Sequence, residues 1–138
     1  MPEETTGGVP RPLLDAARAA GRNAYAPYSG FRVGAAVLTE AGGVYAGANV
    51  ENASYDLTMC AERSAIFHAV AREGADCRIR SLLVYTATAQ PTTPCGACRQ
   101  VLIELGPDAV VYCVSDGAPP VRYTIAELLP DAFRLPER

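Results

Sequence analysis

The sequence predicts an α/β protein, a three-layer α/β/α sandwich around a mixed five-stranded sheet. Apolar stretches of strand length alternate with stretches whose apolar residues repeat at helical spacing. The resulting order is helix, two-strand hairpin, helix, strand, helix, strand, so the later strands are joined by helical crossovers and are expected to run parallel. At 138 residues the chain is long enough for one domain with a buried core and too short for two.

The elements follow in order along the chain. Residues 1–10 are polar and rich in Gly and Pro, and we expect a flexible tail before a single domain at 11–138. A first helix is predicted from Pro12 to about Tyr25, where residues 26–30 break it. The remaining elements are strands at 31–38 and 44–50 forming a hairpin, a helix at 62–73 ended by Gly74, a strand at 79–86, a helix from Cys95 to about Leu105, strands at 110–114 and 121–123, and a short helix opened by the capping box at 124–127.

Composition and charge exclude several classes of function. The formal net charge is −3, which disfavours a nucleic-acid partner. All twelve basic residues are arginine, so Schiff-base and phosphate-loop lysines are excluded. The sequence shows no signal peptide and no apolar run of membrane-spanning length, and we expect a cytoplasmic protein with no membrane partner. In that compartment the five cysteines are interpreted as ligands or buried thiols rather than disulfides.

Two short cysteine stretches carry the predicted chemistry. Cys60 is followed by Glu62, and Cys95 and Cys98 lie about a quarter of the chain later. Both stretches fall at predicted helix starts, where the unpaired N–H groups favour thiolates. Three thiolates can bind one zinc ion and leave a fourth position open for water, with the Glu62 carboxylate beside it to move protons.

Other interpretations of the cysteines stay open at this point. Cys95 and Cys98 also suit a thioredoxin-like redox pair, which would leave Cys60 and Glu62 without a role. A closed structural zinc site would take Cys77 or Cys113 as a fourth ligand. The single histidine, His68, lies roughly 12 Å along a helix from Cys60 and is too distant to share the metal.

Three thiolates on a dication leave a centre of charge −1, which opposes ionisation of bound water. A nearby positive group would offset this charge. Arg63 lies three residues after Cys60 on the same helical face and is expected to donate to the thiolate sulfurs. Arg99 and Gln100, just after Cys98, are further candidates for the same role.

Five motifs, in order and suitably spaced, resemble the zinc-dependent cytidine deaminase family in its short, three-cysteine, homotetrameric branch. They are YSGFRVGAA at 28–36, NVENAS at 49–54, CAER at 60–63, PCGACRQVL at 94–102 and LLPDAF at 128–133. The resemblance covers nearly the whole chain from about Tyr25 to Phe133. Asp56, where the family commonly has glycine, departs from the pattern, and Arg32 is expected to face solvent.

The resemblance implies a fold, a cofactor and a reaction. It implies one Zn²⁺ per subunit on Cys60, Cys95 and Cys98, with Glu62 as the proton shuttle in the hydrolysis of cytidine or deoxycytidine to uridine or deoxyuridine and ammonia, a pyrimidine-salvage reaction. It also implies a homotetramer whose neighbouring subunits complete each nucleoside pocket. The residues that it places against substrate are Phe31, Asn49, Glu51 and Ala61, with Tyr55 and Phe133 reaching a neighbouring subunit's pocket.

Two further functions remain as alternatives. A deaminase of a cytosine-nucleoside antibiotic such as blasticidin S shares the Cys-Ala-Glu and Pro-Cys-Gly motifs. The ribose-holding Asn49 and Glu51, and the terminal Phe133, favour the plain nucleoside. A non-catalytic, zinc-stabilised nucleoside-binding protein is a second alternative, and an intact Glu62 argues against it.

Overall fold

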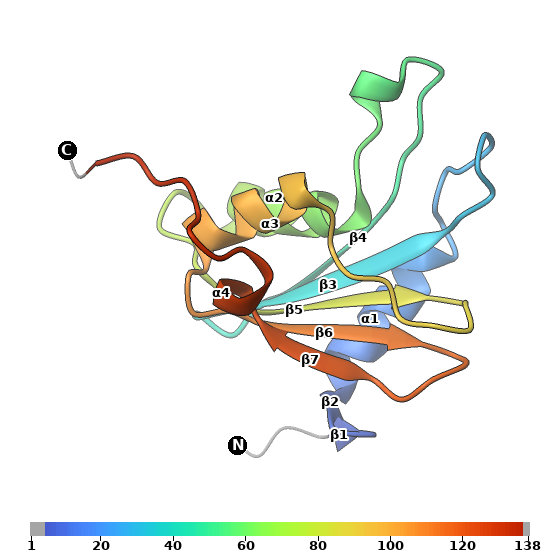
Figure 1. The fold of residues 1–138 in the computed structure, drawn as a ribbon, viewed down its shortest axis with the longest axis horizontal. Coiled ribbons are helices and arrows are strands. Elements are labelled where there is room, and N and C mark those ends of the chain that lie inside the picture. The colour runs from blue at the N-terminus through green and yellow to red at the C-terminus, as the bar shows by residue number, and fades with distance from the viewer. Residues whose placement is uncertain (1–4, 137–138) are drawn as a thin grey trace.

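A mixed five-stranded sheet forms the middle of the protein, with strand order β4-β3-β5-β6-β7 (Figure 1). The computed structural model describes residues 5–136. Helix α1 lies on one face of the sheet, and α2 and α3 lie on the other, which confirms the predicted three layers. The elements are β1 (Thr5–Thr6), β2 (Val9–Pro10), α1 (Arg11–Gly21), β3 (Val33–Thr39), β4 (Val44–Ala48), the 3-10 turn η1 (Tyr55–Leu57), α2 (Ala61–Glu73), β5 (Ile79–Thr86), α3 (Gly96–Leu105), β6 (Val110–Ser115), β7 (Val121–Thr124) and α4 (Ile125–Leu128).

The strand directions follow from the lengths of the connections. As predicted, β3 and β4 form an antiparallel hairpin, and β5 pairs parallel with β6 through the α3 crossover. β3 also pairs antiparallel with β5, a pairing that the sequence did not indicate. β7, whose direction the sequence left open, runs antiparallel to β6. Only residues 116–120 separate these two strands, and a parallel crossover needs a dozen residues or more.

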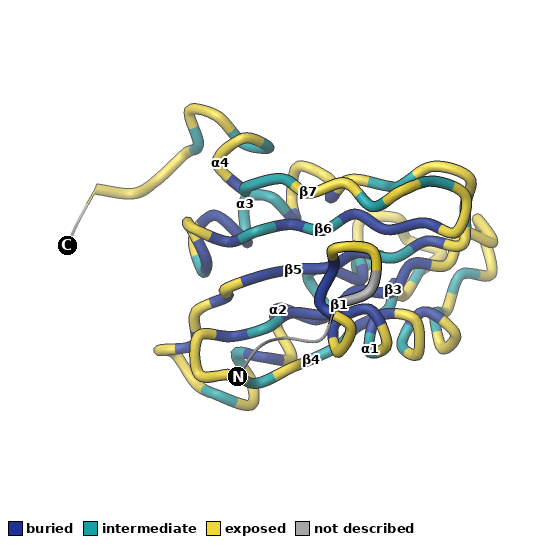
Figure 2. Tube along the Cα trace, turned by 90° about the horizontal axis from the view of Figure 1, so that it is seen from below, coloured by how far each residue is buried: buried dark blue, intermediate teal, exposed yellow. Residues whose placement is uncertain are grey.

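Strand β3 divides its side chains between two cores. Val33, Ala35 and Val37 pack in the larger core beneath α2 and α3. Ala36, on the alternate face, packs in a smaller core with residues of α1. This period of two is the direct consequence of strand geometry. β5 is buried along most of its length between the two layers (Figure 2).

Two glycines let the helices approach the sheet closely. A Cβ atom on Gly34 of β3 would overlap the carbonyl oxygen of Ala17 in α1. On the other face, a Cβ atom on Gly47 of β4 would lie 2.5 Å from the backbone nitrogen of Ala65 in α2. Gly47 therefore sets the distance between α2 and the sheet.

Gly47→Ala is expected to destabilise the fold by about 1–3 kcal/mol, because the added methyl meets helix backbone that cannot rotate away. Urea unfolding followed by circular dichroism measures this loss. Gly96→Ala is the matched control, since a Cβ atom there meets nothing within 4 Å. Equal free energies of unfolding for wild type and Gly47→Ala would show that this contact does not fix the distance between α2 and the sheet.

The N-terminal segment is more structured than the expected tail. Thr5–Thr6 and Val9–Pro10 pair as a short antiparallel ribbon, and the Val9 side chain is only 2% exposed in the smaller core. Residues 1–4 lie outside the described residues. Helix α1 ends at Gly21, earlier than predicted, because Tyr25 forms a β-bridge with Val50 and donates its backbone N–H to the Asn49 carbonyl.

The segment from 50 to 60 projects from the body of the domain (Figure 1). It carries the side chain of Tyr55, which is 80% exposed, and that of Leu57. At the C-terminal end Phe133 and Leu135 are also exposed (Figure 2). No helix in the part of the chain that the structure describes has both the length and the apolar character needed to cross a bilayer.

Candidate active site

The two cysteine stretches meet where two helices begin. Cys60 is the N-cap residue of α2 and Cys95 is the N-cap residue of α3, both with extended backbone dihedrals. Neither helix has a side-chain cap at this end, so unpaired backbone N–H groups and the positive end of each helix dipole face the cysteines. This arrangement confirms the predicted placement at helix starts, and it favours ionised sulfur.

Three sulfur atoms converge with spacing suited to a metal ion. The Sγ atoms of Cys60 and Cys95 lie 3.7 Å apart, and those of Cys95 and Cys98 lie 3.5 Å apart. All three Sγ atoms lie within 4.8 Å of one another. Thiolates on a tetrahedral zinc, at Zn–S distances of about 2.3 Å, are about 3.8 Å apart, so the cluster fits zinc.

The cluster contains three sulfur atoms, and no fourth donor joins it among residues 5–136. Cys77 and Cys113 are buried elsewhere, and within residues 5–136 neither belongs to this group. His68 is exposed, and its ring nitrogen Nδ1 lies 3.2 Å from the Ala46 carbonyl oxygen. The closed four-cysteine site is therefore not formed. Convergence of Cys60 on the Cys95–Cys98 pair favours a metal site over a redox pair.

The Arg63 guanidinium lies against the cluster, as predicted. Its Nη2 donates to the Cys60 sulfur at 3.3 Å, while its buried Nε has no partner among the described residues. Hydrogen bonding to Cys98 and to Arg63 lowers the pKa of Cys60 to about 5. Hydrogen bonding to the Cys60 thiolate, together with burial, raises the pKa of Cys98. Arg63 therefore stabilises negative charge on the sulfur ligands.

Glu62 lies in a cavity of about 210 Å³ beside these sulfurs. Its side chain is 5% exposed, and burial raises its pKa to about 7, with the Cys60 thiolate adding to the effect. A carboxyl group with such a pKa can both accept and donate a proton near neutral pH. The cavity is lined by Phe31, Val33, Asn49, Thr58, Met59, Cys60, Ala61, Glu62, Thr92, Thr93 and Cys95.

Comparison with known proteins identifies this arrangement. A family profile described as the cytidine and deoxycytidylate deaminase zinc-binding region matches residues 10–114, which include all three cluster cysteines and Glu62. The chain belongs to the cytidine and deoxycytidylate deaminase family. It is therefore a zinc-dependent hydrolytic enzyme, and the Cys60, Cys95 and Cys98 cluster has the donor set that can hold the zinc ion.

Deaminases of this family match the chain over most of its length. The cytidine deaminase of Halalkalibacterium halodurans is 48% identical over 88% of this chain and 91% of that protein. A crystal structure of cytidine deaminase from Burkholderia pseudomallei has 46% identity and a TM-score of 0.83, covering 91% of this chain and 99% of that one. The Mycobacterium tuberculosis cytidine deaminase structure has 39% identity and a TM-score of 0.76, covering 89% and 95% of the two chains.

The structure brings together part of the predicted substrate set. Phe31, Asn49 and Ala61 line the cavity beside Glu62. Glu51 does not line it, although its side chain is held near the cavity by the loop around Ser29. Tyr55 and Phe133 are 80% and 67% exposed and do not line the cavity of their own chain.

Asn49 and Glu51 also hold the backbone of the deaminase near the cavity. The Asn49 side chain accepts from the Val33 backbone N–H at 2.9 Å and donates to the Phe31 carbonyl at 2.8 Å. The Glu51 carboxylate accepts from the backbone N–H and the hydroxyl of Ser29, which lowers its pKa. Each carboxylate or amide oxygen has two acceptor positions, so these bonds leave capacity for a ligand.

The sequence suggested that Arg99 and Gln100, just after Cys98, would donate to the thiolate sulfurs. In the structure both side chains donate to backbone carbonyl oxygens instead. Gln100 donates its amide to the Phe133 carbonyl at 3.2 Å. The Arg99 guanidinium instead donates to the carbonyl oxygens of Pro94, at 2.7 Å, and Leu128, at 2.8 Å. Arg99 therefore fixes the loop that leads into α3, and Arg63 alone of these three side chains contacts a thiolate.

Sequence reasoning missed several residues that line the cavity. Thr58 and Met59 lie immediately before Cys60, and Thr92 and Thr93 lie just before Cys95. Their positions in the chain could have predicted this, because residues that lead into two converging helix starts must lie around the same space. Val33 lines the cavity because β3 begins beside it.

Proposed function

We propose that the enzyme hydrolyses the amino group of cytidine and deoxycytidine, which gives uridine or deoxyuridine and ammonia and serves pyrimidine salvage. The observation that carries this proposal is the buried Glu62 carboxyl group beside a three-sulfur metal cluster, in a cavity that also has an aromatic and an amide side chain. The relatives from Halalkalibacterium halodurans and Burkholderia pseudomallei, which are both cytidine deaminases, support the same substrate class.

In this mechanism Glu62 moves the protons. Zinc, when bound to the three cysteines, supplies a Lewis acid that lowers the pKa of a water molecule. The Glu62 carboxylate takes a proton from that water as C4 of the pyrimidine is attacked. It then delivers protons to N3 and to the departing amino group. A pKa of about 7 suits both steps, since the same oxygen must accept and then donate.

Residues in the cavity and beside it orient the nucleoside. The Phe31 ring packs against sugar and base, the amide of Asn49 and the carboxylate of Glu51 hold the ribose hydroxyls, and the backbone at Ala61 contacts the base. Asn49 is 7% exposed and lines the cavity, so its position supports this role. Its bonds to Phe31 and Val33 fix the amide before substrate arrives.

We further propose a homotetramer in which neighbouring subunits close each pocket. Tyr55 and Phe133 are large aromatic residues whose side chains are mostly exposed in the single chain. Both lie on segments that extend away from the sheet, where they can reach a second copy (Figure 1). Sedimentation equilibrium measures the mass of the oligomer in solution. Because Tyr55 is proposed to close a neighbouring pocket, Tyr55→Ala is expected to raise KM for cytidine while leaving the zinc content unchanged.

The function is tested with zinc-loaded protein and cytidine. We expect release of one ammonia per cytidine together with loss of the absorbance band of the cytosine ring. Blasticidin S is assayed in parallel. Faster turnover of this antibiotic than of cytidine would show that the antibiotic, rather than cytidine, is the preferred substrate. Stoichiometric nucleoside binding with no ammonia from either compound would show a binding protein instead of an enzyme for these substrates.

Arg63→Ala is expected to lower kcat about 10–100-fold with a much smaller change in stability. Arg63 lowers the pKa of Glu62 and of Cys60, so its removal moves the acid limb of the pH–rate profile to higher pH. The full pH profile of kcat measures both effects. Arg80→Ala, which removes an exposed charge from β5, is the control. An unchanged rate and profile in Arg63→Ala would make this arginine a surface charge only.

A further inference from the structure

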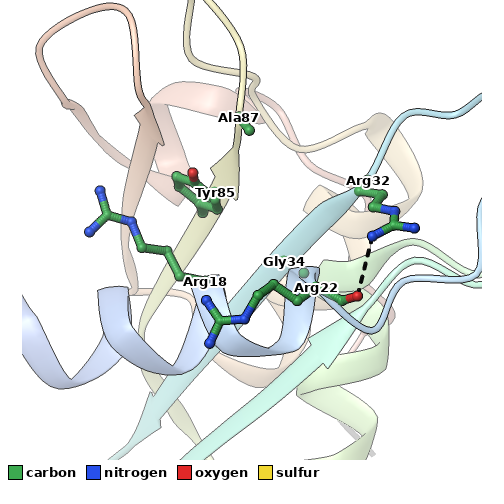
Figure 3. A pocket seen from close by; sticks show the side chains of 7 residues that line it. Arg18, Arg22, Arg32, Gly34, Tyr85 and Ala87 are labelled. Carbon is green, nitrogen blue, oxygen red and sulfur yellow. Dashed lines mark hydrogen bonds between the residues drawn. The ribbon is translucent and has the colours of Figure 1, made fainter.

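A second cavity, of about 310 Å³ (Figure 3), lies on the α1 face of the sheet, opposite the face that α2 and α3 cover. It is bounded by α1, by the residues just before and at the start of β3, and by the end of β5. The side chains of three exposed arginines line it. Its lining residues are Arg18, Gly21, Arg22, Arg32, Gly34, Tyr85 and Ala87.

The positive charge at this cavity is only partly balanced. The chain carries a net charge of −3, yet three of its twelve arginines line this cavity. Arg18 has a distant ion pair with Asp116, at 3.9 Å. For Arg22 and Arg32 no carboxylate lies within 4 Å among residues 5–136. Two guanidinium groups are therefore available to an anion.

Close packing of α1 against β3 forms one wall of the cavity. Gly21 and Gly34 lie where α1 contacts β3, and neither contributes a side chain to the cavity. Arg18 lies in the last turn of α1 and Arg22, four residues later, is the C-cap residue with helical dihedral angles, so the two residues share a face. Arg32 donates from Nη1 to the Arg22 carbonyl at 3.4 Å, which holds the loop against the end of α1 (Figure 3).

The Tyr85 ring forms an apolar wall on one side. The Arg18 guanidinium lies 5.2 Å from the centroid of this ring, and the Tyr85 hydroxyl donates to Asp116 at 2.8 Å. These contacts fix the ring, which lines the cavity. The site thus combines fixed apolar surface with guanidinium donors.

We propose that this cavity binds the phosphate group of a small organic molecule. Guanidinium groups match phosphate in charge and donate two parallel hydrogen bonds to it. A cavity of about 310 Å³ is within the range for small-molecule sites and exceeds what free phosphate fills. The glycines, Ala87 and the Tyr85 ring accept the uncharged part of the ligand. No contact in this proposal involves the metal cluster or Glu62.

Binding is measured by titration calorimetry on the zinc-loaded enzyme at low ionic strength. The probes are adenosine 5′-monophosphate, inorganic phosphate and adenosine, so that the arms separate an organic phosphate from the free ion and from the nucleoside alone. We expect adenosine monophosphate to bind at least about tenfold more tightly than phosphate, and adenosine not to bind. Absence of saturable binding by both phosphate compounds would overturn the proposal.

Arg22→Ala/Arg32→Ala is the test variant, and Arg72→Ala/Arg80→Ala removes the same charge from exposed positions elsewhere. We expect the first variant to lose binding at least tenfold with cytidine turnover retained, and the second to bind as wild type. An equal loss in both would show a general charge effect and refute a local site. A change of solution mass in the first variant, with binding unchanged, would assign these arginines to a subunit contact instead.

Discussion

Glu62→Gln is expected to lower kcat for cytidine by about 10²–10⁴-fold while the enzyme keeps its zinc and its fold. Glutamine preserves the size of the buried side chain and cannot accept the proton that the mechanism assigns to this position. Stopped-flow absorbance gives the rate, and metal analysis of the same sample gives the zinc content. Glu40→Gln, which changes an exposed carboxylate in the β3–β4 turn, is expected to leave the rate unchanged.

The same variant changes the pH dependence of stability in the zinc-free protein. Burial raises the pKa of Glu62 from 4.5 to about 7, so the folded chain holds this proton more tightly than the unfolded chain. The resulting stabilisation is complete below pH 4.5 and is lost as pH rises through 7. Glu62→Gln removes this loss and is expected to be more stable than wild type at pH 8, by about 3 kcal/mol. Equal stability at pH 8 would contradict a buried, proton-holding carboxyl group.

Cys98→Ala is expected to abolish both zinc retention and turnover. Cys98 is 1% exposed and supplies one of only three sulfur ligands, so its loss leaves two ligands, too few for a stable site. Loss of the metal also removes binding energy that stabilises the fold, and Tm is expected to fall. Metal analysis after dialysis and calorimetric scans measure the two effects.

Cys77→Ala is the matched control for this variant. Cys77 is also buried, at 4% exposed, but lies outside the sulfur cluster. We expect it to retain one zinc per chain and its turnover, with only a modest loss of stability from the smaller side chain. Full zinc content in Cys98→Ala, or zinc loss in Cys77→Ala, would mean that the ligand set is misassigned.

Much of the site could be predicted because its chemistry is local in sequence. Cys60 and Glu62 lie within three residues of one helix start, and Cys95 and Cys98 lie at another. The helix period also places Arg63 over the Cys60 sulfur, which the structure confirms. In each case the spacing along one helix fixes the spacing in space.

The rest depends on contacts between distant segments. Gln100 follows the cysteines, yet its amide bonds the Phe133 carbonyl, 33 residues away. Helix α1 ends early because Tyr25 pairs with Val50, which no local pattern announces. Arg32 was expected simply to face solvent. Its exposed side chain lies beside the end of α1 because β3 and α1 pack through Gly34.

The alternation along β3 places two cavities back to back. Val33 lines the cavity at Glu62 and Gly34 lines the arginine cavity, so consecutive residues serve opposite faces of one strand. Arg32 lies between Phe31 and Val33, both of which are bonded by the Asn49 side chain. If a ligand at Arg32 changes nucleoside affinity through this backbone, the nucleoside must change that ligand's affinity by the same factor. The two sites would then be thermodynamically coupled through a single strand. Titration of one ligand with and without the other present would give the coupling free energy.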